Sequence, residues 1–162
     1  MATPDFILRL REKIGHELLW LTGVTAVVVK DDAVLLVERA DNGWVTPVTG
    51  IIDPGEEPAV AAVRETREEA AITAEAEALV WAHVLPPMQY PNGDRSQYLD
   101  LVFRCRWVAG DPHPADGENV RAWWCPIDRL DDERIGDDMR ERIRMALEHT
   151  GSARFETTAV AV

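Results

Sequence analysis

The stretch RETREEA, residues 64–70, contains three glutamates whose spacing could bind a cation. On a helix, Glu65, Glu68 and Glu69 stand at positions i, i+3 and i+4, so their carboxylates share one face and repel each other. Two interleaved arginines offset part of this repulsion, and a solvated acidic face is one interpretation of the run. The other is a divalent ion among the oxygens, because Mg²⁺ prefers oxygen ligands and is commonly shared between carboxylates and a phosphate.

The residues before this run favour the second interpretation. From Gly50 the chain reads GIIDPGEEPAVAAVRETREEAAI, in which a glycine, five residues, Glu56 and seven residues precede the charged run, and the apolar Ile72 follows it. This pattern closely resembles the Nudix box, G-x5-E-x7-R-E-U-x-E-E-x-G-U, where U is an apolar residue. The chain is therefore similar to the MutT/Nudix hydrolases over residues 50–72, which disfavours a merely solvated face.

Three positions depart from the family pattern. Thr66 stands where an aliphatic residue is usual, at a helix face that should be buried. Ala71 replaces the second glycine, so the chain must leave the helix without the residue that adopts a left-handed backbone most easily. Upstream, PVTG replaces the more usual PGGG, which puts Thr49 at a position whose backbone carbonyl often helps to hold metal. Because every residue has a carbonyl, Thr49 is kept as a predicted metal ligand.

The resemblance implies a role for each charged residue of the box. Glu68 and Glu69 are expected to be the principal Mg²⁺ ligands, with Mn²⁺ as an alternative metal. Glu65 is expected to be a further ligand or the base that deprotonates water. Glu56 and Arg64 are expected to fix these carboxylates in place, which puts Arg64 among the catalytic residues. The implied reaction is attack of water on a diphosphate linkage, with metal that polarises the phosphoryl oxygens.

Two residues outside the box are candidates for substrate or metal contact. Arg39 ends the segment LLVERA, and in similar Nudix sequences an arginine here reaches substrate phosphate; the alternative is a surface ion pair with Glu38. Glu118 lies with Asp116 in PADGEN, a loop where the family often keeps an acidic ligand or base; the alternative is a solvated loop acid. The predicted substrate-binding residues are Arg39, Gly50, Glu56 and Glu118.

The implied substrate is a nucleoside diphosphate linked to a group X. ADP-ribose-like compounds, dinucleoside polyphosphates and (d)NTPs stay open, because Pro86 and Pro87 match a family hint for the first class and Tyr90 matches one for the second. Two other functions compete with hydrolysis. One is a Nudix domain that senses a nucleotide without cleaving it, although the box glutamates are all present. The other is an acidic interaction domain whose glutamates only aid solubility.

The composition agrees with an enzyme acting on a small molecule. The 162 residues suit one domain, and 46% of them are hydrophobic, which is enough for a core. The net charge of −12 disfavours a nucleic acid polymer as partner, because its phosphates need a basic surface. Cys105 and Cys125 lack the spacing of a zinc site or a disulfide framework and are expected to pack in the core. Neither a secretion signal nor a membrane-spanning run is evident, so we expect a cytoplasmic protein.

Three helices are predicted. The segment 3–15 has the apolar spacing of a short amphipathic helix, with Thr3 as its cap and Pro4 just inside it. The box helix is predicted over 58–70, because proline is favoured at the first helical position. A closing amphipathic helix is predicted over 137–150. The residues predicted to face inward on the box helix are Ala59, Val60, Ala62 and Val63.

The remaining segments predict strands and the fold. Two apolar runs separated by Asp31 and Asp32 predict a hairpin, and further strands are predicted before and after the box helix. This order indicates an α+β fold with a mixed β-sheet flanked by helices. The resemblance implies that this is the Nudix-type α/β/α sandwich. The predicted division is an N-terminal helical extension over 1–19, a Nudix hydrolase domain over 20–150 and a flexible C-terminal tail over 151–162.

Aromatic and imidazole side chains give further predictions. Trp44, Trp81 and Trp123 are positions at which an adenine-stacking role is weighed against core or dimer contacts. The four histidines have no metal-ligand spacing, so surface or hydrogen-bonded roles are expected. The N-terminal helix and the apolar strand edges suggest a homodimer.

Overall fold

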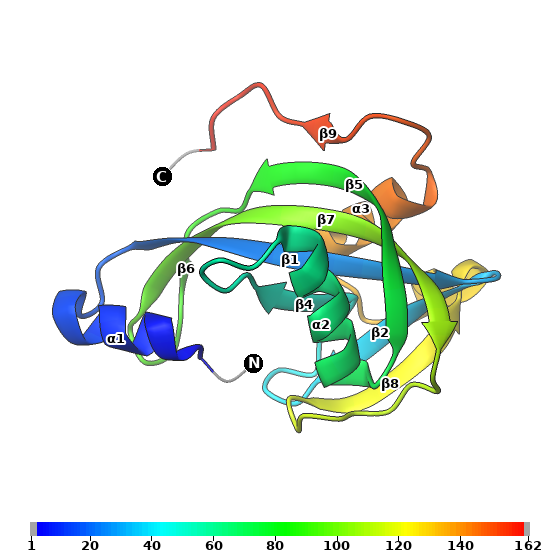
Figure 1. Ribbon diagram of the computed structural model, residues 1–162, viewed down its shortest axis with the longest axis horizontal. Helices are drawn as coiled ribbons and strands as arrows, with labels where there is room; N and C mark the ends of the chain where they lie inside the picture. The colour runs from blue at the N-terminus through cyan, green and yellow to red at the C-terminus, as the bar shows by residue number, and fades with distance from the viewer. Residues whose placement is uncertain (1–2, 161–162) are drawn as a thin grey trace.

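The fold is a mixed β-sheet with a helix against each face (Figure 1). The computed structural model describes residues 3–160. Its elements in chain order are α1 (Asp5–Ile14), β1 (Leu19–Lys30), β2 (Ala33–Arg39), β3 (Val45–Thr46), β4 (Val48–Ile51), α2 (Pro58–Ala70), β5 (Thr73–Val84), β6 (Met88–Gln89), β7 (Arg95–Ala109), β8 (Asn119–Pro126), the 3₁₀ helix η1 (Ile127–Asp132), α3 (Asp137–Leu147) and β9 (Arg154–Phe155). Both α2 and α3 pack on β1, β5 and β7, from opposite faces, which confirms the predicted fold class.

β1 and β7 form a parallel pair at the centre of the sheet. Their register runs from Leu19 opposite Ser96 to Val29 opposite Arg106. The strands lie in the order β3-β2-β1-β7-β5-β9, with β4 also paired to β1 and β8 to β2. The predicted hairpin is confirmed, because Val29 of β1 pairs with Val34 of β2. This topology places β4, the strand that leads to the box helix, directly against β1.

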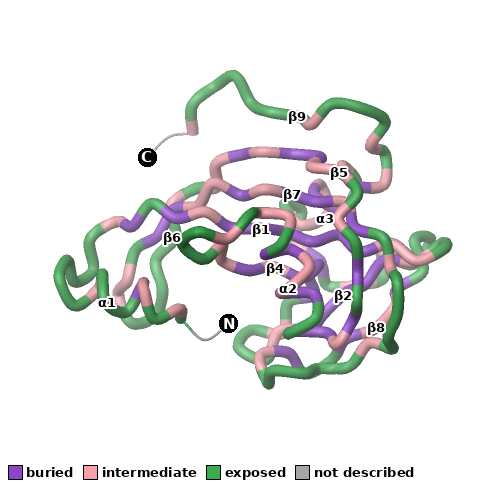
Figure 2. The backbone as a smooth tube through the Cα atoms, in the orientation of Figure 1, coloured by how far each residue is buried: buried purple, intermediate pink, exposed green. Residues whose placement is uncertain are grey.

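Buried residues follow one another along β1 and β2, which are largely purple in Figure 2. On β1, Val24 and Val28 belong to the cluster beneath α2, whereas Val27 belongs to the cluster on the α3 side. Successive residues of a strand point to opposite faces, so a continuous apolar run suits a strand that is covered on both. Cys105 and Cys125 are buried and free, as expected.

The predicted limits of the box helix are confirmed by α2. Of the four residues predicted to face inward, Ala62 is buried, Ala59 and Val63 are half-buried, and Val60 is 58% exposed. The prediction for Val60 is therefore wrong. The buried face of α2 passes through Ala61, Glu65 and Glu69, and Val60 lies outside this face. Alanines on the buried face let the helix backbone lie close to the sheet.

α1 differs in one detail from the predicted N-terminal helix. It begins at Asp5, with Pro4 as its capping residue and no side-chain cap, so the assignment of Thr3 as cap is wrong. Pro4 keeps an extended backbone with ψ 145° and therefore precedes the helix instead of starting it. Ile7 is buried and packs with Leu21 of β1, which attaches α1 to the end of the sheet.

The C-terminal segment differs in part from the predicted flexible tail. Arg154 and Phe155 form β9, which pairs in parallel with Trp81 and Ala82 of β5. The Arg154 guanidinium lies over the Trp81 ring, 5.0 Å from its centroid, and donates to Glu141 of α3 at 2.9 Å. Through these contacts the C-terminal segment packs against the outer edge of β5.

α3 covers the face of the sheet opposite α2. It ends at Leu147 instead of at residue 150, and Ile143 and Ala146 on its predicted apolar face are buried. None of the helices in the described part of the chain has the length and apolar character that crossing a bilayer requires.

Candidate active site

α2 places its three glutamates in different environments. Glu65 and Glu69 are buried, with exposed fractions of 5% and 3%, whereas Glu68 is exposed. Burial raises the pKa of Glu65 to about 7 and that of Glu69 to about 7 as well. The charge of Glu65 adds to the rise at Glu69. Two neighbouring buried carboxylates are unfavourable unless a positive partner compensates them.

Arg64 connects the other acids of this region. Its Nε and Nη2 donate to the two oxygens of Glu56 at 2.8 and 2.9 Å, and its Nη1 donates to Glu65 and to Glu68, both at 2.9 Å. Nη2 also donates to the Ile51 carbonyl at 3.2 Å. The hydrogen bond from Arg64 lowers the pKa of Glu56. This planar cation therefore ties the loop before α2 to two carboxylates on α2, as a positioning role requires.

Gly50 has to be a glycine because Glu65 fills the space beside it. A Cβ added at residue 50 would lie 2.1 Å from Cδ of Glu65, which is far inside van der Waals contact. The backbone of Gly50 is held opposite Val24 by the pairing of β4 with β1. The first glycine of the box thus allows a buried carboxylate to lie directly against a strand.

Asn119, the first residue of β8, is a site residue that the sequence did not single out. It is buried, and its Nδ2 donates to Oε2 of Glu69 at 3.0 Å. This hydrogen bond lowers the pKa of Glu69, while the nearby Asp116 raises it. Glu118 lies one residue before Asn119, and its N–H donates to the Asp116 carboxylate at 2.9 Å. The polar loop PADGEN marks this part of the site in the sequence, but it is the side-chain amide of its last residue, Asn119, that contacts the box.

Arg39, the last residue of β2, forms an ion pair, but not the predicted one with Glu38. Its Nε and Nη2 donate to the two oxygens of Asp41, each at 3.0 Å. Among the described residues Arg39 pairs with Asp41 and not with Glu38, so the predicted alternative is wrong. The turn that follows β2 brings the Asp41 carboxylate to the guanidinium. Thr49, the other predicted residue near this point, lies on β4 opposite Thr25 of β1.

The departures from the box pattern are accommodated locally. Thr66 is fully buried, and its hydroxyl donates to the Ala62 carbonyl at 2.8 Å. Ala71 adopts the left-handed backbone that glycine would supply, with φ 56° and ψ 27°. Its N–H donates to the Arg67 carbonyl at 3.1 Å, and the N–H of Ile72 donates to the Thr66 carbonyl at 3.4 Å. The helix therefore ends in a capped turn with a residue that adopts this conformation at an energetic cost.

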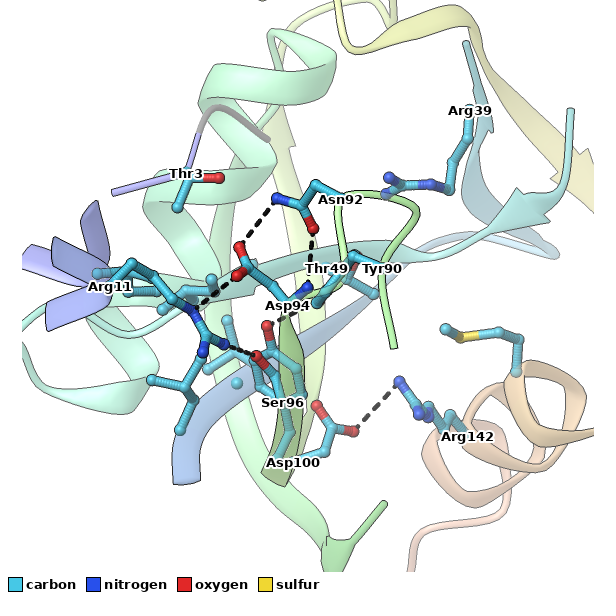
Figure 3. A pocket seen from close by; sticks show the side chains of 18 residues that line it. Thr3, Arg11, Arg39, Thr49, Tyr90, Asn92, Asp94, Ser96, Asp100 and Arg142 are labelled. Carbon is cyan, nitrogen blue, oxygen red and sulfur yellow. Dashed lines mark hydrogen bonds and ion pairs between the residues drawn. The ribbon is translucent and has the colours of Figure 1, made fainter. Parts of the chain in front are cut away.

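A cavity of about 300 Å³ lies beside β4, between α1, β7 and α3 (Figure 3). Thr49 and Gly50 of the box region line it, and so does Arg39. Tyr90 and Tyr98 also line it, with their hydroxyl oxygens 3.0 Å apart. Of the predicted site residues, the structure thus brings Arg39, Thr49 and Gly50 to one cavity. Glu65 is outside the described lining, but it packs against Gly50 from the α2 side.

The chain also resembles known proteins in sequence and in structure. The family model of the NUDIX domain matches residues 20–145. This chain belongs to the Nudix hydrolase family. A MutT-like protein from Streptomyces ambofaciens is 32% identical over 130 residues, which are 79% of this chain and 77% of that protein.

Solved structures share the Nudix fold of this chain. A NUDIX hydrolase from Nitrosomonas europaea has a TM-score of 0.65 and 27% identity, covering 78% of this chain and 88% of that one. An ADP-ribose pyrophosphatase from Streptococcus suis has a TM-score of 0.66 and 22% identity, covering 84% of this chain and 98% of that one.

The Nudix box of this chain offers the oxygen donors that a hard divalent cation prefers. Glu65 and Glu69 are buried carboxylates that repel each other, and Glu68 shares a surface hollow with Asp116. Across residues 3–160, no three acidic, imidazole or thiol side chains converge as a formed metal site. In this arrangement the Glu68 carboxylate accepts a hydrogen bond from Arg64. The chemistry of the donors fits Mg²⁺.

The tryptophans considered for base stacking lie elsewhere in this Nudix domain. Trp81 is buried and stacks on His83, with 3.6 Å between the ring centroids. Trp44 and Trp123 each lie against an arginine side chain. None of the three lines the cavity beside β4, as far as the described residues show, so the adenine-stacking prediction gains no support.

Proposed function

We propose that this Nudix hydrolase is a Mg²⁺-dependent pyrophosphohydrolase that cleaves the diphosphate linkage of a small nucleotide, a nucleoside diphosphate joined to a group X. The observation that supports the proposal is the burial of Glu65 and Glu69 on one face of α2, with Glu65 against Gly50, a residue that also lines the cavity. A cation compensates these like charges, and a substrate diphosphate offers it further oxygen ligands. Mn²⁺ is the alternative metal.

The side chains of α2 take the following roles in this proposal. Glu68 and Glu69 are the principal metal ligands, together with the backbone carbonyl of Thr49. Bound Mg²⁺ supplies polarisation of the phosphoryl oxygens and a lower pKa of the attacking water. Glu65 is a further ligand or the group that accepts the proton from water. Arg64 keeps the carboxylates in position through the hydrogen bonds described above, and Asn119 orients Glu69.

The cavity beside β4 is the proposed place of the substrate. Arg39 and Gly50 line it and remain proposed substrate contacts, whereas Glu56 and Glu118 are outside the described lining. Glu56 is held by Arg64, which makes it a positioning residue. The Streptococcus suis structure with the same fold is named as an ADP-ribose pyrophosphatase, which supports ADP-ribose-like compounds as the first substrates to test. Dinucleoside polyphosphates and (d)NTPs are the alternatives.

A substrate panel tests this function. The full chain is incubated with ADP-ribose, dinucleoside polyphosphates, nucleotide sugars and (d)NTPs, each with Mg²⁺ and with Mn²⁺, and product formation is measured. At least one compound should be hydrolysed in a metal-dependent manner. Inactivity across the panel with both metals would overturn the proposal.

Metal binding is tested separately from turnover. Titration with Mg²⁺, followed by tryptophan fluorescence and by thermal unfolding, should give a saturable rise in melting temperature, because binding to the folded state alone stabilises it. A weak unsaturated drift would favour an acidic surface without a site. Tight nucleotide binding without turnover would favour the nucleotide-sensing alternative.

Location and assembly are part of the same proposal. We place the protein in the cytoplasm, with no membrane and no nucleic acid polymer as partner, and we propose a homodimer. Leu8 and Leu10 of α1 and Trp20 of β1 are exposed apolar residues at one end of the molecule and support a second copy there. Light scattering coupled to size-exclusion chromatography should give twice the monomer mass, and a monomer at micromolar concentration would contradict the homodimer.

A further inference from the structure

A buried ion pair at one end of the cavity has no part in the proposed hydrolysis. Asp100 of β7 is 3% exposed, Arg142 of α3 is 2% exposed, and Arg142 Nη1 lies 3.3 Å from Asp100 Oδ2. Both residues line the cavity, and the Arg142 side chain points from α3 toward Asp100 (Figure 3). Arg142 Nη1 also donates to the hydroxyl of Thr25 at 2.8 Å, and His83 Nε2 lies 3.2 Å from Asp100 Oδ2. Burial of both charges costs desolvation free energy, which their attraction and further hydrogen bonds have to offset.

The pair keeps unused hydrogen-bonding capacity. Asp100 Oδ2 is close to Thr25, His83 and Arg142, whereas among the described residues Oδ1 has a hydrogen bond only with the Thr25 hydroxyl, at 3.1 Å. A carboxylate oxygen accepts two hydrogen bonds, so Oδ1 has room for one more. Arg142 Nε is buried and has no hydrogen-bond partner within the described structure. An unused acceptor and an unused donor thus lie at the same end of the cavity.

Gly23 makes room beside Asp100 Oδ1. It lies on β1 opposite Asp100 and lines the cavity. A Cβ at residue 23 would lie 3.7 Å from Oδ1 and 3.4 Å from the Gly50 carbonyl oxygen. Because glycine has no side chain, a ligand atom can occupy this space instead. The same space adjoins Gly50, so a molecule that reaches Asp100 also lies beside the box strand.

We propose that Asp100 selects the nucleobase of the substrate by accepting a hydrogen bond from an exocyclic amino group, as carried by adenine, guanine or cytosine. The proposal rests on the proposed function, because it assigns the nucleoside part of the substrate to this cavity. The cavity is of a size that holds part of a nucleotide. Asp100 is the specificity-determining residue, while Arg142 and Thr25 position its carboxylate.

The preference follows from the chemistry of a carboxylate. Ionised Asp100, paired with Arg142, offers only acceptors, so it favours an amino group and repels a carbonyl oxygen at the same place. The ring N–H of uracil is flanked by two carbonyl groups, and that of hypoxanthine has one beside it. These bases therefore bring an oxygen toward the carboxylate when they donate to it. The expected discrimination is roughly tenfold to a hundredfold, the size of one hydrogen bond to a charged group.

Binding of nucleotide analogues that resist hydrolysis tests this preference. The α,β-methylene diphosphates of adenosine, guanosine, cytidine, inosine and uridine are titrated into the full chain with Mg²⁺ and followed by calorimetry. At least one analogue with an amino group should bind tenfold or more tightly than the inosine and uridine analogues. Equal affinities for all five would overturn the proposal.

Gly23→Ala tests the residue assignment without removing a charge. The added methyl group makes ordinary van der Waals contacts, so the fold should be kept, but it takes the space beside Asp100 Oδ1. The preference for amino-bearing bases over the inosine and uridine analogues should fall to less than threefold. The melting temperature should not change. The matched control is Gly151→Ala, where an added Cβ has no neighbour within 4 Å, and it should keep the preference. A folded Gly23→Ala protein with the full preference, or with an equal loss for every base, would overturn the proposal.

Asp100→Asn provides the second variant. An amide can donate to a carbonyl oxygen, so the inosine and uridine analogues should gain affinity relative to the others. An unchanged ranking in a folded variant would count against Asp100, and Gly23→Ala decides the matter if Asp100→Asn does not fold. These outcomes are separate from those of the substrate panel. An inactive protein that still binds amino-bearing bases selectively would overturn the hydrolysis and keep the selection by Asp100.

Discussion

The box helix and the cavity beside it are built in opposite ways. The acids proposed for catalysis lie in one continuous segment, from Gly50 to Glu69, and one arginine within this segment donates to all of its box glutamates except Glu69. The cavity draws Gly23 from β1, Asp100 from β7 and Arg142 from α3. Under the two proposals above, most of the chemistry comes from local spacing, whereas the choice of substrate comes from residues that only the fold brings together.

The largest expected effect concerns the acids of the box. Glu69→Gln keeps an acceptor for the Asn119 amide but removes the charge, so kcat/KM should fall by ~10³-fold, equivalent to several kcal/mol of metal-assisted stabilisation. Steady-state rates on the substrate found in the panel measure this loss, and circular dichroism should show an intact fold. The matched control, Glu12→Gln on the exposed side of α1, should retain the full rate. An unchanged rate in Glu69→Gln would remove Glu69 from the catalytic assignment.

The second effect concerns the close approach of β4 and α2. Gly50→Ala places a methyl group where the Glu65 carboxylate lies, so either the carboxylate or the strand has to move. Such overpacking typically lowers the free energy of unfolding by ~1–3 kcal/mol, and a displacement of about 1 Å at the site can reduce activity by ~10²-fold. Chemical denaturation and kcat measure the two effects. Gly151→Ala, in open space, should change neither, and a fully active Gly50→Ala enzyme would show that the position of Glu65 is unimportant.

A smaller effect is expected at the arginine that joins the acids. Arg64→Lys keeps the charge but loses the planar group that donates to Glu56, Glu65 and Glu68 together. We expect kcat to fall by about 10–100-fold with little change in KM, as for residues that orient metal ligands. Arg67→Lys is the matched control, because Arg67 is exposed on the same helix. A rise in KM alone would indicate that Arg64 contacts the substrate instead.

The contrast between the local box segment and the cavity built from distant elements explains which features the sequence could predict. The limits of α2, the hairpin and the mixed sheet follow from periodicity and turn residues, because these signals lie within a few residues of each other. Asn119 and Asp100 could not be found in this way. Asn119 reaches Glu69 across 50 positions of the chain, and Asp100 faces Gly23 only through the parallel pairing of β7 with β1. The prediction for Val60 is wrong because the apolar pattern of α2 does not show that Glu65 and Glu69 lie on its buried face.

The smallest effect is expected at Ala71, where the box departs from the family pattern. The sign of the change in the free energy of unfolding shows whether backbone conformation or side-chain packing controls this position. Ala71 has a left-handed backbone, so Ala71→Gly should raise the free energy of unfolding by up to about 1 kcal/mol, after allowance for the greater entropy of the unfolded chain.

Ala70→Gly, one residue earlier and within the helix, should lower the free energy of unfolding by about 1 kcal/mol through helix propensity, and the loss of its buried methyl group adds to this. Denaturant unfolding of both variants measures the pair. The carbonyls of Glu69 and Ala70 accept hydrogen bonds from the loop that leads to Asn119, so this helix end is where the local part of the site meets the part that the fold assembles. If both variants were destabilised equally, the left-handed turn would not control this junction, and contacts of the Ala71 side chain would have to explain why alanine is kept there.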